Sequence, residues 1–321
     1  MKIWERSTLK VIACGALLWL GGGGLSRGEE ADVIVAAGTG GNDEYAGTFA
    51  KWTASWEKAA AAGGAHFTTA NDLASLQQAV QAQAKETPEP LWLVLLGHGT
   101  FDGKEGKFNL RGDDLAASAL AEWLRPCKRP LVIVCGFSAS GPFLKPLSAP
   151  DRVIVTATKS GSEINYARFG GYFAEAIADP AADLDKDGQT SVLEAWLSAA
   201  QRVADFYKNE GRIATEHALL DDNGDGIGTP PDWFAGVRVV KKAKDNRAPD
   251  GQRASQLCLI PSAPERELTP QLRADRDALE TELAHLRETK AATPAAEYEA
   301  KLEALLLRLA QLYRGAIRAA K

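Results

Sequence analysis

The chain has 321 residues, of which 45% are hydrophobic and 25% charged, an ordinary composition for a globular protein. The formal net charge is -5 and there is no basic block, so nucleic acid is not expected as a partner. This length allows one large domain with an appendage, or two domains.

Residues 1–29 have the features of a signal peptide. Three basic residues precede an apolar run at 11–20, and this run is too short to span a membrane comfortably. Cleavage is expected between Gly24 and Glu30. We therefore expect an exported protein, periplasmic or extracellular, with no membrane span after the signal is removed.

The part of the chain up to residue 178 alternates between strands and helices. Several segments are predicted to be strands, and the most apolar of them to be buried on both faces: 32–37, 66–69, 91–96, 131–134 and 152–158. Helical spacing or capping marks the segments between and after them: 45–62, 71–84, 113–124 and 169–178. This order predicts an α/β fold, a three-layer sandwich around a mainly parallel sheet.

Two polar loops follow neighbouring strands of this predicted sheet. His98 lies between Gly97 and Gly99 after one strand, and Ser138 follows the next strand. Ligands of parallel sheets bind outside the carboxyl ends of the strands, which is where both residues are expected. His98 is then a candidate base for acyl transfer, and the Gly99 N–H a candidate oxyanion donor. A structural turn histidine is the alternative.

The segment 183–194 matches a calcium-binding EF-hand loop at every position. It has oxygen-bearing side chains at loop positions one, three, five, nine and twelve, and Gly188 at position six. Calcium prefers six to eight hard oxygen ligands. The predicted ligands are Asp183, Asp185, Asp187, Gln189 at position seven, Ser191 and Glu194. A solvated acidic turn is the alternative.

The segment 221–232 is a weaker match to the same loop. Its twelfth residue is Asp232, which reaches less far than glutamate, and two prolines forbid a normal exit helix. The predicted ligands are Asp221, Asn223, Asp225, Ile227 through its carbonyl, and Asp232. Both loops are expected to hold calcium as a brace for the fold rather than as a sensor.

The rest of the chain is predicted to be a linker at 246–267 and a helical hairpin at 268–321. Thr-Pro pairs at 269–270 and 293–294 are strong helix start signals. In the second helix, Tyr298, Leu302, Leu305, Leu309 and Leu312 follow a four-three spacing typical of a coiled-coil seam. The hairpin is expected either to dock on the body or to mediate self-association.

One apolar strand is followed by His-Gly, and about forty residues later a second apolar strand ends in a nucleophile-x-Ser-Gly pattern. This arrangement resembles the legumain and caspase-type cysteine peptidases of clan CD. The resemblance covers about residues 32–178 and includes the loop at 156–163. The segment at 216–226 resembles bacterial exported members that carry calcium loops. The resemblance implies a caspase-hemoglobinase fold. Together with the segments described above, we expect a signal peptide at 1–29, an α/β domain with the calcium loops at 30–245, a linker at 246–267 and a helical hairpin at 268–321.

By this resemblance, His98 takes the place of the catalytic histidine and Gly99 an oxyanion position. The family has Ala-Cys-Glu-Ser-Gly at the nucleophile, whereas this chain has Phe-Ser-Ala-Ser-Gly at 137–141, so Ser138 stands where the cysteine is expected. A serine hydroxyl needs a well-aligned base, and no acid partner for His98 is evident. A shifted register would place Cys135 at the nucleophile instead.

Three functions stay open from the sequence. The protein is an inactive homologue that binds polypeptide through a calcium-braced fold, a serine hydrolase that uses Ser138 with His98, or a cysteine peptidase that uses Cys135. In each case a polypeptide is the expected substrate or ligand.

Overall fold

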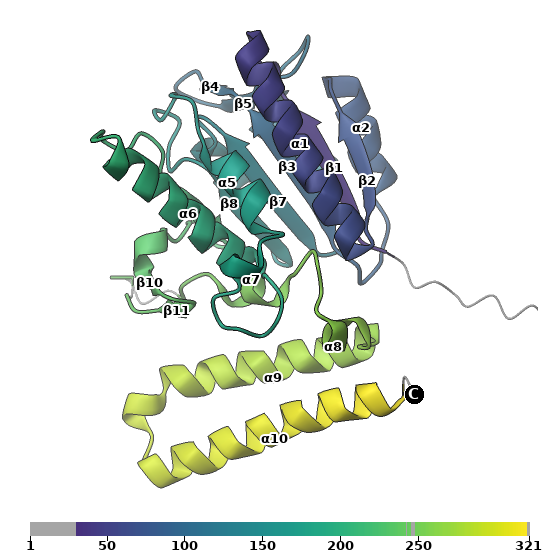
Figure 1. The fold of residues 1–321 in the computed structure, drawn as a ribbon, viewed down its shortest axis with the longest axis vertical. Coiled ribbons are helices and arrows are strands. Elements are labelled where there is room, and N and C mark those ends of the chain that lie inside the picture. The colour runs from purple at the N-terminus through teal and green to yellow at the C-terminus, as the bar shows by residue number, and fades with distance from the viewer. Residues whose placement is uncertain (1–29, 242, 245–247, 320–321) are drawn as a thin grey trace, which may run out of the picture.

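The computed structural model describes residues 30–241, 243–244 and 248–319, so the expected signal peptide lies outside the described residues. Its centre is a six-stranded sheet with the order β2-β1-β3-β7-β8-β9 (Figure 1). The strands are β1 (Asp32–Ala37), β2 (His66–Ala70), β3 (Leu91–Gly97), β7 (Leu131–Phe137), β8 (Arg152–Thr156) and β9 (Leu219–Asp221). All neighbours are parallel except β9, which runs antiparallel to β8.

Helices cover both faces of this sheet. One face carries α1 (Asp43–Gly63), α5 (Phe169–Ala176) and α6 (Val192–Asn209), and Figure 1 looks onto this layer. The other carries α2 (Leu73–Ala82), α3 (Ala117–Leu124) and α4 (Leu144–Leu147). Successive strand residues point to opposite faces, so Val33 joins the first core and Ile34 the second. The expected three-layer α/β sandwich with a mainly parallel sheet is therefore confirmed.

A small antiparallel sheet follows β3 and leads into α3. It consists of β4 (Gly99–Phe101), β5 (Gly106–Phe108) and β6 (Leu115–Ala116). The other short elements are η1 (Gly141–Phe143), η2 (Pro180–Ala182), η3 (Pro231–Trp233), and the pair β10 (Phe234–Ala235) and β11 (Arg238–Val239). The small sheet matters for the site because it fixes the backbone of Gly99.

The described part of the segment expected to be a linker is packed against the body. It contains α7 (Gln252–Gln256) and α8 (Ala263–Arg266). Ala254 is fully buried and Asp250 is 2% exposed. The proline- and arginine-rich composition predicts a linker. Instead, the buried carboxylate of Asp250 and the apolar residues after it fix the segment 250–259 to the main core.

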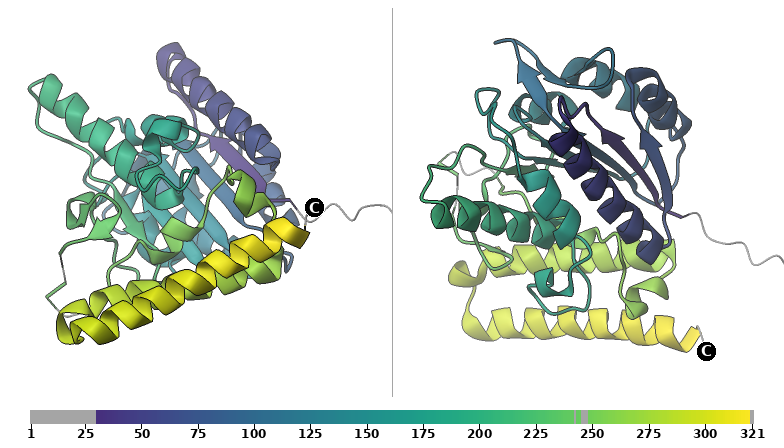
Figure 2. Two further views of the ribbon diagram at one scale, coloured as in Figure 1. Left: turned by 60° about the horizontal axis from the view of Figure 1, so that its bottom comes forward. Right: turned by 45° about the horizontal axis from the view of Figure 1, so that its top comes forward.

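The C-terminal hairpin is formed by α9 (Pro270–Glu288) and α10 (Ala295–Ala319), joined by η4 (Lys290–Ala292). The two helices lie side by side beneath the sheet (Figure 2), and the predicted leucine seam closes between them. Arg273 pairs with Glu89, just before β3, so the hairpin docks at the amino ends of the strands. Within the described ranges, no helix is both long and apolar enough to cross a membrane.

Candidate functional site

His98 and Ser138 are brought to the same edge of the sheet. They follow β3 and β7, which are adjacent and parallel, and the last paired residues are Gly97 and Phe137. The two turns make direct contact, because the Ser138 hydroxyl accepts a hydrogen bond from the Gly99 N–H at 3.2 Å. The site therefore lies at the carboxyl ends of the central strands, opposite the hairpin.

The Ser138 side chain is enclosed. Ser138 is 1% exposed, and its Oγ also lies 3.4 Å from the Gly99 carbonyl oxygen, to which the hydroxyl donates. The serine turn presses on the backbone of the histidine turn: a Cβ atom on Gly99 would lie 2.4 Å from the Ser138 carbonyl oxygen. Glycine is required at position 99 because the two turns approach this closely.

The Gly99 N–H is directed toward Ser138 by the register of the small sheet. Gly99 faces Phe108 across β4 and β5, and the neighbouring Asn109 N–H donates to the His98 carbonyl. Paired residues of an antiparallel ladder alternate between hydrogen-bonded and non-hydrogen-bonded pairs, so Gly99 and Phe108 form a non-hydrogen-bonded pair. The Gly99 N–H is therefore left for Ser138, and the donor expected to hold an oxyanion already has a partner.

The His98 ring is held in an aromatic cage. Its centroid lies 4.9 Å from the Tyr45 ring, 5.3 Å from Phe49 and 6.0 Å from Tyr166. Among the described residues, no hydrogen bond joins the ring to Ser138 or to any acid. Burial lowers the pKa of His98, which favours the neutral imidazole. The base-to-nucleophile hydrogen bond of an acyl-transfer site is thus not formed.

The serine turn is fixed by contacts with the loop after β8. Ala139 has a φ of 55°, a left-handed conformation that costs energy for a residue with a Cβ, and its N–H donates to the Glu163 carbonyl. The Ser140 hydroxyl accepts from the Thr158 N–H at 3.1 Å. The Glu163 carboxylate then binds the His217 ring at 2.5 Å. Nothing in the sequence pairs Glu163 with His217, which is 54 residues away.

Cys135 lies inside β7 rather than at its end. It is completely buried, and burial raises the pKa of its thiol far above the ordinary range. A thiolate at Cys135 is therefore both inaccessible and disfavoured, whereas Ser138 directly follows β7.

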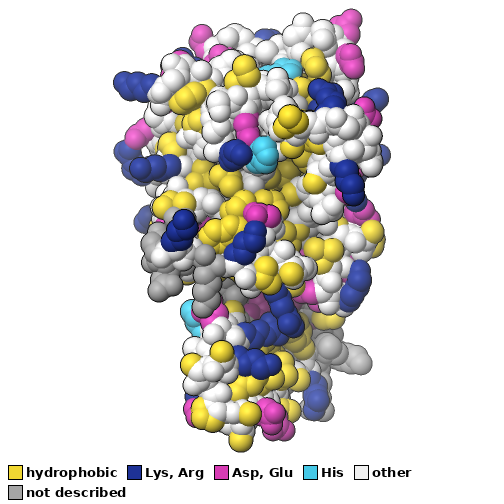
Figure 3. Space-filling model, turned by 90° about the vertical axis from the view of Figure 1, so that its left-hand side faces the viewer, with side chains coloured by type: hydrophobic (Ala, Val, Ile, Leu, Met, Phe, Trp, Pro, Cys, Tyr) yellow, Lys and Arg dark blue, Asp and Glu magenta, His cyan; other side chains and the backbone are white. Residues whose placement is uncertain are grey.

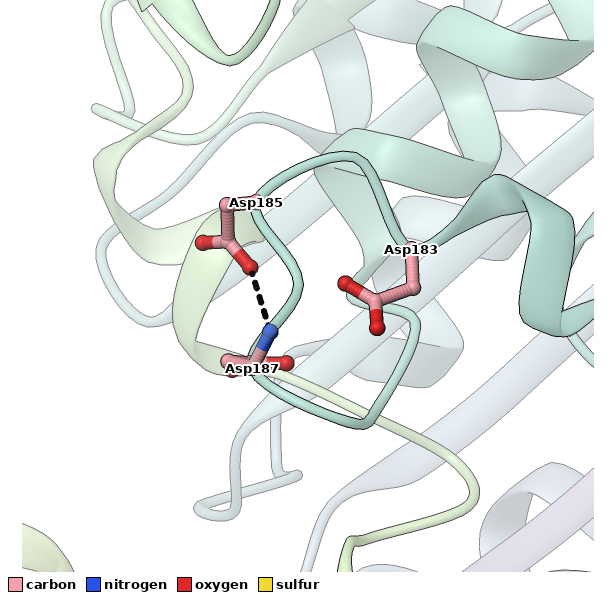
Figure 4. Close-up of side chains that lie close together, drawn as sticks. All are labelled: Asp183, Asp185 and Asp187. Carbon is pink, nitrogen blue, oxygen red and sulfur yellow. Dashed lines mark hydrogen bonds between the residues drawn. The ribbon is translucent and has the colours of Figure 1, made fainter.

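The first predicted calcium loop gathers its acidic side chains around one point. Side-chain oxygens of Asp183, Asp185 and Asp187 lie within 4.8 Å of one another (Figure 4). Burial and neighbouring carboxylates raise the pKa of Asp187 to about 6. Glu194 is 2% exposed, and its carboxylate accepts from the N–H groups of Leu184 and Asp185. This oxygen-rich donor set fits a hard cation such as calcium.

The second predicted loop has the same local turns but a different exit. Asn223 accepts from the Asp225 N–H, and Asp225 accepts from the Ile227 N–H. Asp221 is 1% exposed, and one of its carboxylate oxygens has no hydrogen-bond partner. Asp232 is directed elsewhere, because it pairs with Lys241 at 2.5 Å and its side chain is 68% exposed.

An apolar groove of about 730 Å³ lies between α6 and the segment that follows the second loop. Figure 3 shows hydrophobic side chains gathered in the middle of this side of the molecule. The lining includes Leu184 of the first loop, Leu197 and Ala204 of α6, Pro230 of the second loop, and Phe234 after it. The two loops therefore flank one groove, and the sequence contains no signal for it.

No protein-family model matches the chain, and no curated protein matches it. Among solved structures, it is similar to the Drosophila initiator caspase Dronc, with a TM-score of 0.45 and 13% identity over 61% of this chain and 80% of that one. Caspase-1 from Spodoptera frugiperda has a TM-score of 0.39 and 12% identity over 60% and 85% of the two chains. Raptor from Chaetomium thermophilum has a TM-score of 0.35 and 10% identity over 49% and 18%.

Proposed function

We propose that this protein is a non-catalytic, legumain-like peptidase homologue that binds polypeptide through a calcium-braced α/β fold. One observation carries the proposal: the Ser138 hydroxyl is buried and occupies the Gly99 N–H. A nucleophile must reach its substrate, and an oxyanion hole must offer a free donor. Here the two groups satisfy each other, so their hydrogen bond joins the segments that follow β3 and β7.

The alternative function, a serine hydrolase, requires the opposite behaviour of Ser138. It requires Ser138 to react with a fluorophosphonate probe and requires His98 to assist. We expect no labelling of Ser138 in the folded protein by intact-mass measurement and peptide mapping. Stoichiometric labelling that disappears in His98→Ala would refute the non-catalytic proposal and establish a hydrolase.

We place the polypeptide in the groove beside α6. Its apolar lining and its volume suit several side chains of an extended segment. Ala204→Arg would put a charged side chain into the groove, whereas Asp205→Arg adds the same residue next to it, outside the lining. We would select binders from a displayed library of random peptides and measure their affinity by fluorescence anisotropy. We expect Ala204→Arg to weaken peptide binding at least tenfold and Asp205→Arg to leave it nearly unchanged.

The calcium part of the proposal rests on the donor set at 183–194. Three aspartates held this close repel one another, and a divalent cation relieves the repulsion. The first loop leads into α6, which forms one wall of the groove. A bound ion would therefore fix the position of that wall. Export, as proposed from the N-terminal segment, would take the protein to calcium-rich surroundings.

A further inference from the structure

The two loops share a hydrogen-bond pattern beyond their sequence match. In each, the position-three oxygen accepts the N–H of position five, and the position-five oxygen accepts the N–H of position seven. Positions four and six have left-handed backbones in both: Lys186 and Gly188 in the first, Gly224 and Gly226 in the second. The second loop therefore repeats the first in the conformation of its backbone and in the contacts of the side chains at positions three and five.

The acid that closes the first loop is Glu194, at position twelve. One of its oxygens accepts the N–H groups of positions two and three, at 2.7 and 3.1 Å. Its other oxygen accepts the hydroxyl of Ser191 at position nine, at 2.7 Å. The Glu194 N–H donates back to that hydroxyl at 3.3 Å. These four contacts define where the closing acid sits relative to the loop.

Asp250 makes the same four contacts with the second loop, although it lies 18 residues beyond Asp232. One oxygen accepts the N–H groups of Asp222 and Asn223, positions two and three, at 2.9 and 3.2 Å. The other accepts the hydroxyl of Thr229, at position nine, at 2.6 Å. The Asp250 N–H donates back to that hydroxyl at 3.3 Å.

The segment that supplies Asp250 is itself fixed to the loop. The Asp222 carboxylate accepts the N–H groups of Gly251 and Ala254, at 3.0 and 2.8 Å. Asp250 thus binds the backbone N–H of Asp222, and Asp222 binds the backbone that directly follows Asp250. These hydrogen bonds hold Asp250 against the loop although it lies outside the loop's own twelve residues. A helix leading directly out of the loop could not supply the acid in the usual way, because the two prolines after Thr229 obstruct a helix there.

A second observation points to a bound cation. Asp221 is 1% exposed, and its Oδ1 accepts the Gly224 N–H inside the loop. Its Oδ2 is buried with no hydrogen-bond partner. Asp221, Asp222 and Asp250 are all buried, and no lysine or arginine pairs with any of them among the described residues. A buried carboxylate oxygen without a partner is costly unless a cation binds it.

We propose that the second loop binds a divalent cation, calcium by its oxygen donors, and that Asp250 rather than Asp232 is its closing acidic ligand. The inference rests on the proposed calcium bracing and extends it to a second site. The other ligands would be the side chains of Asp221, Asn223 and Asp225 and the carbonyl of Ile227. Such a site would join the sheet edge at β9 to the segment before α7.

Calcium titration of the purified protein, with bound ions counted by equilibrium dialysis, tests the inference. We expect two ions in the wild type, one in Asp250→Asn, two in Asp232→Asn and one in Glu194→Gln. Asparagine keeps the shape of Asp250 and its acceptor oxygen, and circular dichroism checks the fold. Two ions in Asp250→Asn with one in Asp232→Asn would overturn the assignment.

Other ion counts distinguish a failure of the second calcium site from a failure of calcium binding as a whole. One ion in the wild type that is lost in Glu194→Gln would overturn the second site and leave the first intact. No ion in the wild type would overturn both. If Asp250→Asn does not fold, a terbium-soaked crystal of the wild type decides: an ion within about 2.6 Å of an Asp250 oxygen supports the assignment. An ion bound by Asp232, or none at this loop, refutes it.

Discussion

Replacing Ser138 with alanine separates a structural serine from a catalytic one by the sign of its effect on stability. In Ser138→Ala the Gly99 N–H loses its hydrogen-bond partner. Ser138 is 1% exposed, so water does not replace the hydroxyl. Leaving a buried donor unsatisfied costs about 1–3 kcal/mol of unfolding free energy. An active-site serine behaves differently, because such residues are often held at the expense of stability.

Urea denaturation followed by tryptophan fluorescence measures this effect. Ser162→Ala is the matched control, since Ser162 is exposed and, among the residues that the structure describes, its hydroxyl forms a hydrogen bond only with Ser160. We expect the control to change the unfolding free energy by less than about 0.5 kcal/mol. A Ser138→Ala protein as stable as the wild type, or more stable, would contradict the assignment of Ser138 as a hydrogen-bonded link between the segments that follow β3 and β7.

Two further predictions concern calcium and pH. Chelation should lower the melting temperature, because one bound ion adds about 2.7 kcal/mol to the unfolding free energy when the free calcium concentration is about 100 times the Kd. In Glu194→Gln this decrease in melting temperature should be smaller. An equal decrease in both proteins would exclude the first loop as a calcium site. Burial lowers the folded pKa of His98 below its unfolded value of about 6.5, so the unfolded chain binds more protons between these values. The stability from neutral His98 is therefore complete above pH of about 6.5 and is lost as pH falls through the folded pKa. Denaturation at pH of about 7.5 and 5 should show a smaller loss in His98→Phe, which keeps an aromatic ring in the cage; an equal loss would exclude His98 as the source.

Much of the fold could be predicted because its strands are continuous apolar runs. The segments at 91–96 and 131–134 are buried on both faces, so their sequences carry no polar alternation and allow one interpretation. Strand adjacency then placed His98 and Ser138 at one edge. The leucine seam of the hairpin could be predicted equally well, because it depends on the spacing of residues within one helix.

The direction of the side chains at the site could not be predicted. Whether His98 faces Ser138 or the cage of Tyr45, Phe49 and Tyr166 depends on the packing of α1 against the end of β3. The occupation of the Gly99 N–H depends on the register of β4 and β5. These are contacts between segments distant in sequence, and neither residue type nor spacing encodes them.

The role of Asp250 was missed for a related reason. Counting twelve positions along the chain finds Asp232, whereas the contacts that define the closing acid come from a separate segment. Composition suggested a linker there, because prolines and arginines are common in solvated connections. The segment is nevertheless packed against the core, because one buried aspartate and the apolar residues after it fix it there.

Alkylation of Ser138→Cys tests the central claim most directly, because Cys135 in the same strand is a built-in reference for a fully buried thiol. Iodoacetamide modification at each position can be followed over time by peptide mass spectrometry. We expect the thiol at position 138 to react about as slowly as Cys135, and equally slowly when His98 is also replaced by alanine. Rapid alkylation at position 138 that depends on His98 would contradict it and identify an open, working catalytic site.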